Sequence, residues 1–270
     1  MSSGYIHTFS AAEQARLVAQ AAFLEPYIFP SIDFIGCAQV LEVGCGVGAE
    51  LQILRRRFPP ARLTGLDSSA SQLAKARELL RAELASGSVA IRQGSAYELP
   101  FADGSFDGVC LIWVLEHLSE PVRALREARR VLRPGGRLIV TEVCNAGLRV
   151  EPHCPAMAEY WGAFNELQRI LGGAPDVGAE LAALAAQAGF ADAQVRALPV
   201  CMDARMTDVA ERRRFIEYWR TLWMSGAEQL LARCAVTPQL VEMMQAEFST
   251  LAQNHSSTYH YSARQLHARR

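Results

Sequence analysis

The sequence lacks long hydrophobic runs and a strong net charge. No apolar stretch approaches the ~18 residues that a membrane-spanning helix needs, and the opening MSSGYIHTFS does not contain the apolar core of a signal peptide. Lys and Arg total 27 against 28 Asp and Glu, which leaves a formal net charge of -1. Such a balance creates no long-range field to attract nucleic acid or an anionic membrane. We therefore expect a cytoplasmic protein that binds neither.

Paired cysteines are also missing. The seven cysteines are scattered, and none belongs to a Cys-x-x-Cys pair. This spacing argues against a cysteine zinc site and a disulfide framework, and for reduced thiols. The cysteines are Cys37, Cys45, Cys110, Cys144, Cys154, Cys201 and Cys234.

Arginines are clustered at three places, Arg55–Arg57, Arg129–Arg130 and Arg212–Arg214. All three clusters lie in stretches with a helical pattern. We expect solvated helix faces here rather than a binding surface.

Strands and helices alternate along the first half of the chain, which has 270 residues, half of them apolar. Ser10 and Glu13 form the pattern of a capping box at the start of a first helix, and Pro26 and Pro30 are expected to end it. The elements expected after it are strand 39–43, helix 49–58, strand 62–67, helix 71–84, strands 89–93 and 106–112, helix 121–132 and strand 137–142. This alternation predicts an α/β fold with a doubly wound parallel sheet.

The pattern loosens after Glu142. We expect a helix at 177–188, a strand near 193–198, two more helices within 207–253 and a last strand near 258–263. The predicted organisation is an N-terminal helical cap or lid at 1–36 and one domain at 37–270. Within that domain we place a core at 39–142, a substrate-side part with a helical insert at 143–256, and the last strand at 257–264.

The motif LEVGCGVGAE, residues 41–50, leads a strand into three glycines. Glycines allow the positive φ and the close ligand approach that a strand-to-helix turn requires. Gly44, Gly46 and Ala49 fit a dinucleotide-binding fingerprint, and Asp67 lies close to the position of its ribose-binding acid. At this point an NAD-dependent dehydrogenase remains open.

The acid in this motif, Glu42, favours a different ligand. A carboxylate two residues before the first glycine would repel a pyrophosphate but attract a cation. S-adenosylmethionine carries an ammonium, a sulfonium and a ribose diol, with no phosphate. Glu42 would face the ammonium side and Asp67 the ribose.

Four stretches give the sequence a resemblance to class I S-adenosylmethionine-dependent methyltransferases of the type 11 motif set. They are VLEVGCGVGAE, LTGLDSS, LPFADGSFDGVCLIWVLEHL and RVLRPGGRLIVTE, in family order between Val40 and Glu142. The resemblance implies a Rossmann-like sheet of seven strands with the last strand antiparallel. It places the cofactor, S-adenosylmethionine, across the carboxyl ends of the first, second and fourth strands.

The resemblance also implies individual cofactor contacts. The glycine loop would contact the methionine part of the cofactor, and Asp67 would contact the ribose. Ser95 and Ala96 would contact the adenine, and the carbonyl of Leu111 would contact the amino group. Tyr5 and His7 resemble lid residues of small-molecule members. The full predicted cofactor set is Tyr5, His7, Glu42, Gly44, Cys45, Gly46, Asp67, Ser68, Gln72, Ser95, Ala96 and Leu111.

Two positions depart from the family pattern. Ser95 stands where the family commonly has an acid that contacts the adenine amino group, so that contact requires a hydroxyl or a water. Trp113 stands where some relatives have an extra acid that binds magnesium with the pair Glu116 and His117. We therefore predict no metal.

Histidines are the natural bases for the reaction because their ordinary pKa is near neutrality. His117 follows the fourth strand, and His153 lies in the irregular stretch after the fifth, so both are catalytic candidates. A capping or packing role for His117 remains open. His255 and His260 are expected at the surface.

Aromatic residues are frequent in the second half: Tyr160, Trp161 and Phe164, then Phe215, Trp219 and Trp223 at four-residue spacing. They are interpreted either as packing of an amphipathic helix or as an apolar lid over an acceptor of metabolite size.

The function predicted from the sequence is methyl transfer to an oxygen or nitrogen of a small-molecule metabolite. Alternatives are methylation of carbon, a non-catalytic S-adenosylmethionine-binding module and, last, the NAD-dependent dehydrogenase. The acceptor and the oligomeric state are not encoded in any recognisable pattern.

Overall fold

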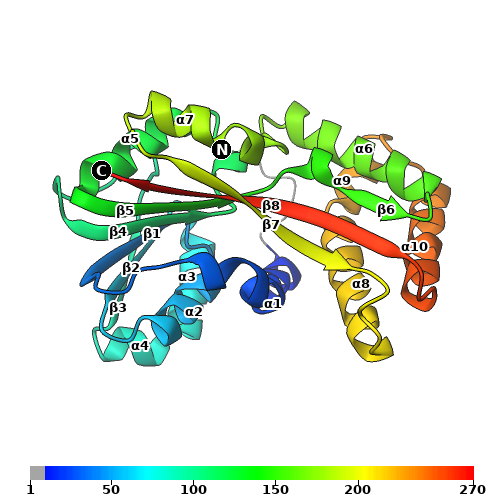
Figure 1. Ribbon diagram of the computed structural model, residues 1–270, viewed down its shortest axis with the longest axis horizontal. Helices are drawn as coiled ribbons and strands as arrows, with labels where there is room; N and C mark the ends of the chain where they lie inside the picture. Colours follow the sequence, from blue (N-terminus) through cyan, green and yellow to red (C-terminus); the bar gives the residue numbers. More distant parts are fainter. Residues whose placement is uncertain (1–9) are drawn as a thin grey trace.

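The computed structural model describes residues 10–270, and its first half alternates strands and helices as the sequence predicts (Figure 1). The elements are β1 (Gln39–Val43), α2 (Ala49–Arg57), β2 (Arg62–Asp67), α3 (Ala70–Leu79), α4 (Arg81–Ala85), β3 (Val89–Gln93), β4 (Phe106–Ile112), α5 (Pro121–Val131) and β5 (Leu132–Glu142). The expected helix at 71–84 is divided into α3 and α4, and β5 begins five residues earlier than expected.

Before this core, α1 spans Ala11–Ile28 and a short 3₁₀ turn spans Phe29–Ser31. Ser10 caps α1 as predicted, because its side chain accepts a hydrogen bond from the backbone N–H of Glu13 at 3.2 Å. The expectation that Pro26 helps to end the helix is wrong. The helix continues through Pro26 to Ile28.

The second half contains more helix than predicted. After the 3₁₀ turn Asn145–Gly147 its elements are β6 (Arg149–Glu151), α6 (Pro155–Ile170), the 3₁₀ turn Val177–Ala179, α7 (Leu181–Gln187), β7 (Gln194–Met202), α8 (Val209–Met224), α9 (Ala227–Ala232), α10 (Pro238–Gln253) and β8 (Thr258–Arg269). No helix was predicted at α6, three helices replace the two expected within 207–253, and β8 extends past 264 to Arg269.

The sheet has the order β3-β2-β1-β4-β5-β8-β6. Strands β5 and β6 pair with one edge of the long strand β8, at its end and its start, and β7 pairs with the opposite edge. The pairs β1–β2, β1–β4, β2–β3 and β4–β5 are parallel, whereas β8 is antiparallel to β5, β6 and β7. The Rossmann-like arrangement and the antiparallel last strand are thus confirmed. The described sheet has eight strands rather than seven, because the three-residue β6 also joins β8.

Helices cover both faces of this sheet, with α5 and α7 on one face and α1 and α2 on the other (Figure 1). Side chains of β1 alternate between the two core clusters: Val40 packs on the face of α1 and α2, whereas Leu41 and Val43 pack on the face of α5 and α7. All four residues from Val40 to Val43 are buried, as expected for a strand that is covered on both faces.

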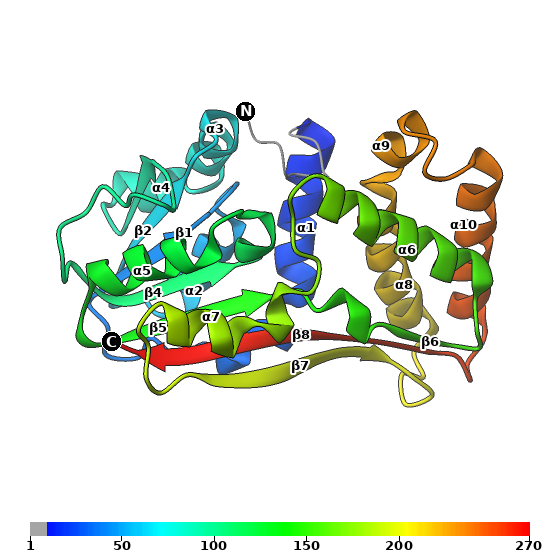
Figure 2. The same cartoon turned by 90° about the horizontal axis from the view of Figure 1, so that it is seen from above.

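Beyond the carboxyl ends of the central strands, α6, α8, α9 and α10 form a helical block (Figure 2). Its interior contains stacked aromatic rings, including Trp161 on Trp223 with ring centroids 4.5 Å apart. Within the described part of the chain, no helix is long and apolar enough to cross a membrane.

The helical block also corrects one expectation about the arginine clusters. Arg212, on α8, is fully buried rather than solvated, whereas its neighbours Arg213 and Arg214 are exposed. Its guanidinium donates hydrogen bonds to the carbonyl oxygens of Asp203 (2.8 Å) and Asn254 (2.7 Å). Arg212 therefore joins the loop before α8 to the loop before β8.

Candidate active site

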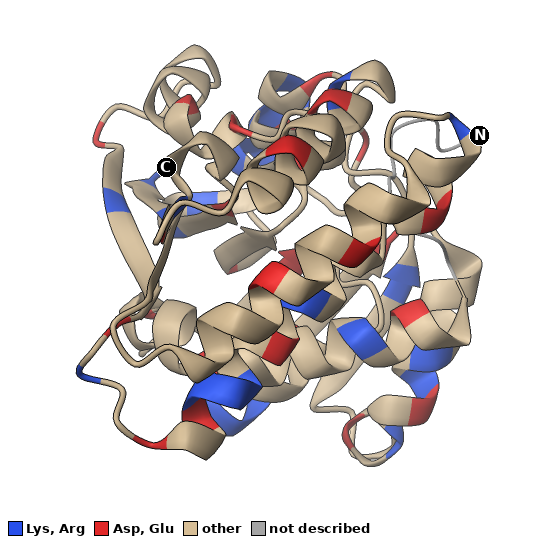
Figure 3. Ribbon diagram, turned by 90° about the vertical axis from the view of Figure 1, so that its right-hand side faces the viewer, with Lys and Arg blue, Asp and Glu red and all other residues tan. Residues whose placement is uncertain are grey.

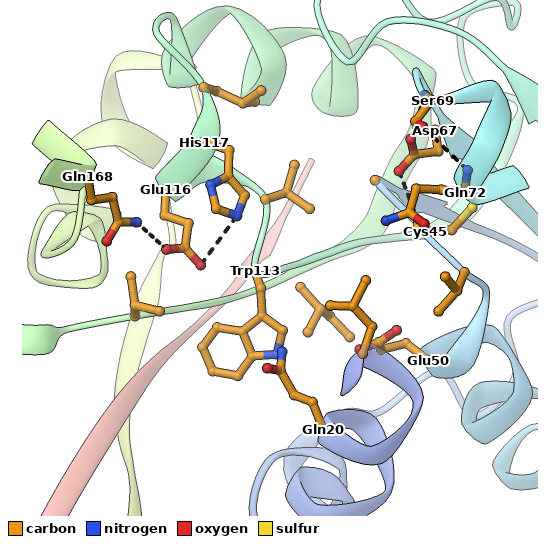
Figure 4. Close-up of a pocket in the computed structure, with 18 of the residues that line it drawn as sticks. Gln20, Cys45, Glu50, Asp67, Ser69, Gln72, Trp113, Glu116, His117 and Gln168 are labelled. Carbon is orange, nitrogen blue, oxygen red and sulfur yellow. Dashed lines mark hydrogen bonds and ion pairs between the residues drawn. The ribbon is translucent and has the colours of Figure 1, made fainter. Parts of the chain in front are cut away.

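A cavity of about 550 Å³ opens at the carboxyl ends of β1, β2 and β4 and is closed by α1, α6 and α8 (Figure 4). This volume is in the range of small-molecule sites. It also lies where the strand order reverses, because β2 is on one side of β1 and β4 on the other. Ligands of open α/β sheets bind at this switch point.

The glycine loop forms one wall of the cavity. Gly44, Gly46 and Gly48 have φ angles of +76°, +49° and +78°, which side chains rarely adopt. A Cβ atom at Gly44 would also lie 2.5 Å from a methyl carbon of Val114. The loop is fixed to β2, because the N–H groups of Gly44 and Cys45 donate to the carbonyl of Leu66 at 2.7 and 3.0 Å. Backbone atoms are thereby exposed to a ligand.

Asp67 lies at the end of β2 and lines the cavity. One carboxylate oxygen accepts from the N–H of Gly46 at 2.9 Å and the other from the N–H of Ser69 at 2.7 Å. Burial raises the pKa of Asp67, while these N–H groups partly oppose the shift. Asp67 thus orders the glycine loop in addition to facing the ligand space. Ser68 and Gln72, the next predicted contacts, also line the cavity.

Glu42 is only 2% exposed and does not line the cavity. It alternates with Leu41 and Val43 along β1, which places its side chain on the face covered by α2. Burial, together with Glu50 and Asp67, raises the pKa of Glu42 well above its ordinary value. Any effect of Glu42 on a ligand is therefore exerted through the loop.

Glu50, in the first turn of α2, supplies a carboxyl group to the cavity wall and was not predicted. Burial raises its pKa to about 7, although Arg16 of α1 opposes the shift. The buried thiol of Cys45 has a pKa well above its ordinary value for the same reason, with Glu42 adding to it. A thiol of this kind is inert at neutral pH.

Of the remaining predicted contacts, the two residues assigned to the adenine lie at the cavity, and Leu111, whose carbonyl was assigned to the amino group, lies in the core. Ser95 and Ala96 line the cavity, and the hydroxyl of Ser95 accepts from the N–H of Tyr97 at 3.1 Å. Leu111 is fully buried in β4, between Val43 and Val140 of the flanking strands. The next residue, Ile112, lines the cavity instead.

His117 faces the cavity from a short 3₁₀ turn after β4, Leu115–His117. Its Nε2 atom lies 3.7 Å from a carboxylate oxygen of Glu116. The buried Glu142 holds this turn, since one of its carboxylate oxygens accepts from the N–H groups of Val114 (2.9 Å) and Leu115 (2.6 Å). Burial and the nearby Glu116 raise the pKa of Glu142 to about 8.

The other predicted base, His153, is exposed just before α6 and is not part of the cavity lining. The structure thus does not bring His117 and His153 together. His255 and His260 are exposed, as expected. Tyr5 and His7 lie outside the described residues. Within residues 10–270, no three His, Cys, Asp or Glu side chains are grouped in a way that would hold a metal ion.

On the cavity wall opposite the glycine loop, Trp161, Phe164 and Trp219 were identified from the sequence, whereas Gln168, Tyr218 and the helix α6 itself were missed. Trp161, Phe164 and Gln168 come from α6, and Tyr218 and Trp219 from α8. The start of α6 was detectable, because Pro155 occupies the first helical turn and apolar residues follow at helical spacing. Of the three α8 aromatics, Phe215 and Trp223 are core residues outside the cavity lining, whereas Trp219 is 2% exposed and also lines the cavity; a lid over an acceptor stays a prediction.

The comparison with protein families identifies a methyltransferase domain model that matches residues 41–140. An O-methyltransferase of Aspergillus sclerotiorum is 35% identical over 170 residues, which cover 60% of this chain and 60% of that protein. The chain spans 43% to 60% of the length of four curated relatives.

Solved structures share the fold. Phosphoethanolamine N-methyltransferase 2 of Haemonchus contortus has a TM-score of 0.59 at 19% identity, covering 97% of this chain and 57% of its own. The [4+2]-cyclase SpnF has a TM-score of 0.53 at 22% identity, with coverages of 94% and 81%. One fold thus carries different reactions. Residues 41–140 nevertheless match the methyltransferase domain in sequence and contain its motifs in order, so this part of the chain belongs to the class I S-adenosylmethionine-dependent methyltransferase family.

Proposed function

We propose that the protein transfers a methyl group from S-adenosylmethionine to an oxygen or nitrogen of a small molecule. The observation that carries this proposal is the charge of the cavity wall. Glu50 and Asp67 line the cavity beside the glycine loop and Glu116 lines it near Gln168, whereas Arg16 is the one Lys or Arg among the described lining residues. A wall with this excess of acids suits a cationic cofactor.

The same wall is unfavourable for a dinucleotide. Arg16 is held by both carboxylate oxygens of Glu13, at 2.6 and 2.7 Å, and by Gln20 at 2.6 Å. A pyrophosphate over the glycine loop would add two negative charges near Asp67 and Glu50. Without a cation to balance them, their desolvation is costly. This argument supports the methyltransferase over the NAD-dependent dehydrogenase.

The residues present fit S-adenosylmethionine. A Cβ atom at Gly46 would meet no atom within 4 Å, so the loop has open space there in which a ligand can approach the backbone, whereas Val114 fills the space beside Gly44. We place the methionine part beside Gly44, Cys45 and Gly46, the ribose at Asp67, and the adenine near Ser95 and Ala96. Ser68 and Gln72 complete this half of the cavity.

When bound, the cofactor supplies an activated methyl group on a positively charged sulfur. The chain has three tasks in the reaction: to align the acceptor, to exclude water and to receive a proton where the acceptor loses one. We assign proton removal to His117, which lines the cavity from the end of β4. The helices α1, α6 and α8 close the cavity against water.

We further infer that the acceptor is a small molecule rather than a nucleic acid or a membrane lipid surface. Figure 3 shows basic and acidic residues intermixed over the helical face of the molecule, with no continuous basic area. A nucleic-acid or membrane partner would require such an area. Cytoplasmic location remains part of this proposal.

Titration calorimetry tests the cofactor. S-adenosylhomocysteine is expected to bind, and NAD at the same concentration is not. Tight NAD binding would contradict the proposal. A second assay follows labelled methyl from S-adenosylmethionine into a pooled metabolite extract. Cofactor binding without any labelled product would favour the non-catalytic binding module, and the labelled product itself would show whether oxygen, nitrogen or carbon is methylated.

A further inference from the structure

The cavity wall opposite the glycine loop is largely aromatic. Trp161 stacks on Phe164 with ring centroids 5.2 Å apart and planes at 14°. Trp219 packs against Tyr261 at 4.8 Å, and Tyr218 stacks on Phe23 of α1 at 3.8 Å. Rings held in this way by their neighbours form a rigid apolar surface. Such a surface favours a flat or ring-containing ligand.

Three described residues that line the cavity each carry a buried polar atom without a hydrogen-bond partner: Gln168 and Trp219 on this wall, and Trp113 just after β4. Gln168 is 2% exposed, and its Nε2 atom donates to a carboxylate oxygen of Glu116 at 2.6 Å (Figure 4). Because a carboxylate can only accept, this bond fixes the orientation of the amide. The other amide atom, Oε1, has no hydrogen-bond partner and can only accept.

The second such atom is the indole Nε1 of Trp219, which is also 2% exposed and without a partner. An indole N–H can only donate. Buried polar groups normally have partners, so an unpaired acceptor and an unpaired donor in a ligand cavity indicate groups that a ligand supplies. Together they match a ligand with one hydroxyl and one further oxygen.

The charges of the cavity exclude an anionic ligand at this wall. Arg16 is engaged by Glu13 and Gln20, and the wall near Gln168 carries the carboxyl group of Glu116. A phosphate or carboxylate there would be buried beside a negative charge without a compensating cation.

We propose that the methyl acceptor is a neutral, ring-containing molecule whose hydroxyl donates to Gln168 Oε1 and whose second oxygen accepts from Trp219 Nε1. This inference rests on the proposed function and specifies its substrate class. In this proposal Gln168 and Trp219 determine the specificity for the acceptor, and residues on the glycine-loop side of the cavity do not contribute to it.

Three probes of one shape test the proposal: 4-methyl-7-hydroxycoumarin, its 7-methyl ether and its 7-phosphate. Each is titrated at pH 6.5 into the protein saturated with S-adenosylhomocysteine, by calorimetry. We expect the hydroxyl compound to bind about 3- to 10-fold more tightly than the ether, the scale of one neutral hydrogen bond, and at least about 10-fold more tightly than the phosphate.

Two variants assign these differences. Gln168→Met, which keeps the length of the side chain, is expected to bind the hydroxyl compound and the ether with equal affinity. It should still bind the phosphate more weakly than either. Trp219→Phe is expected to weaken hydroxyl compound and ether equally, because both retain the ring carbonyl. Glu166→Gln, on the exposed side of α6, is the matched control with unchanged affinities. Gln168→Asn, which withdraws the amide oxygen, replaces Gln168→Met if that variant does not fold.

The outcomes separate the two proposals. Three outcomes would each overturn the acceptor inference alone. The first is that the phosphate binds as tightly as the hydroxyl compound, and the second is that Gln168→Met still prefers the hydroxyl compound to the ether. The third is that no probe binds although S-adenosylhomocysteine does. Failure of S-adenosylhomocysteine to bind the unmodified protein would instead overturn the proposed function.

Discussion

The two halves of the cavity are built in different ways. The half that we propose for the cofactor, the cofactor half, consists of turns that directly follow β1, β2, β3 and β4, and its surface is largely backbone shaped by Gly44 and Gly46. The half that we propose for the acceptor, the acceptor half, consists of side chains from α1, α6, α8 and β8, which range along the chain from Arg16 to Tyr261. Short local motifs thus define one half, and contacts between distant segments define the other.

This difference predicts that the two halves can be changed separately. A backbone cradle tolerates few substitutions because its conformation requires glycine, whereas a side-chain wall changes its ligand when one residue changes. His117 lies where the halves meet. Substitutions on either side test how independent they are.

The largest effect is expected at His117. His117→Asn removes the proposed base and should lower the rate of labelled methyl transfer about 10²- to 10⁴-fold, the usual contribution of general base catalysis. The dissociation constant of S-adenosylhomocysteine should not change. His153→Asn, at an exposed position outside the cavity, serves as the control. If His153→Asn abolished transfer instead, the base would have to be sought outside the cavity.

The second effect concerns the stability of the acceptor half. Arg212→Ala removes the hydrogen bonds that join the Asp203 and Asn254 carbonyls and leaves the space of a fully buried side chain empty, and we expect the free energy of unfolding to fall by about 3 kcal/mol. Equilibrium unfolding in urea measures this change in the free energy of unfolding. Arg213→Ala, one residue away and exposed, should change stability by less than about 0.5 kcal/mol. Equal effects of both variants would show that burial of Arg212 does not matter.

The third effect concerns the cofactor half. Asp67→Ala should weaken binding of S-adenosylhomocysteine by about 1.5–3 kcal/mol, because we propose that the carboxylate accepts hydrogen bonds from the ribose, and it also holds the N–H of Gly46. Asp107→Ala is the matched control. Asp107 also accepts hydrogen bonds from backbone N–H groups, those of Ala38 and Gln39. It lies at the amino-terminal ends of β1 and β4, whereas the cavity lies at their carboxyl ends. A normal dissociation constant in folded Asp67→Ala would remove Asp67 from the site.

The smallest effect is a pH dependence from Glu50. Burial raises its pKa to about 7, so the carboxyl group is mostly protonated below that pH. A cationic cofactor favours the ionised form and lowers this pKa. Affinity for S-adenosylmethionine should therefore increase from pH 6 to pH 8, by less than about 10-fold, with release of a proton. Calorimetry in buffers of different ionisation enthalpy measures the release.

Glu50→Gln should flatten this pH dependence. The other charged groups around Glu50 are Glu42, Asp67 and Arg16, which remain in the variant. An unchanged pH profile in Glu50→Gln would assign the titration to one of them.

Sequence alone predicted which loops line the glycine-loop side of the cavity, because the determinants of these loops are local. Positive φ at Gly44 requires glycine wherever the turn occurs, and Asp67 ends β2 at a fixed distance from the loop. The β/α alternation from β1 to β5 follows from hydrophobic periodicity within each segment. A pattern of short range was sufficient for these features, which is why the cofactor half is the better predicted of the two.

Only the tertiary structure decided the rest. Arg212 has the same sequence surroundings as Arg213, yet one is buried and the other exposed, since burial depends on the loops that fold over α8. Gln168 meets Glu116 across 52 residues of sequence, and Glu42 lies under α2 rather than in the cavity. Which faces of distant elements pack together is a property of the whole chain, and the hydrophobic pattern of a single segment does not specify it.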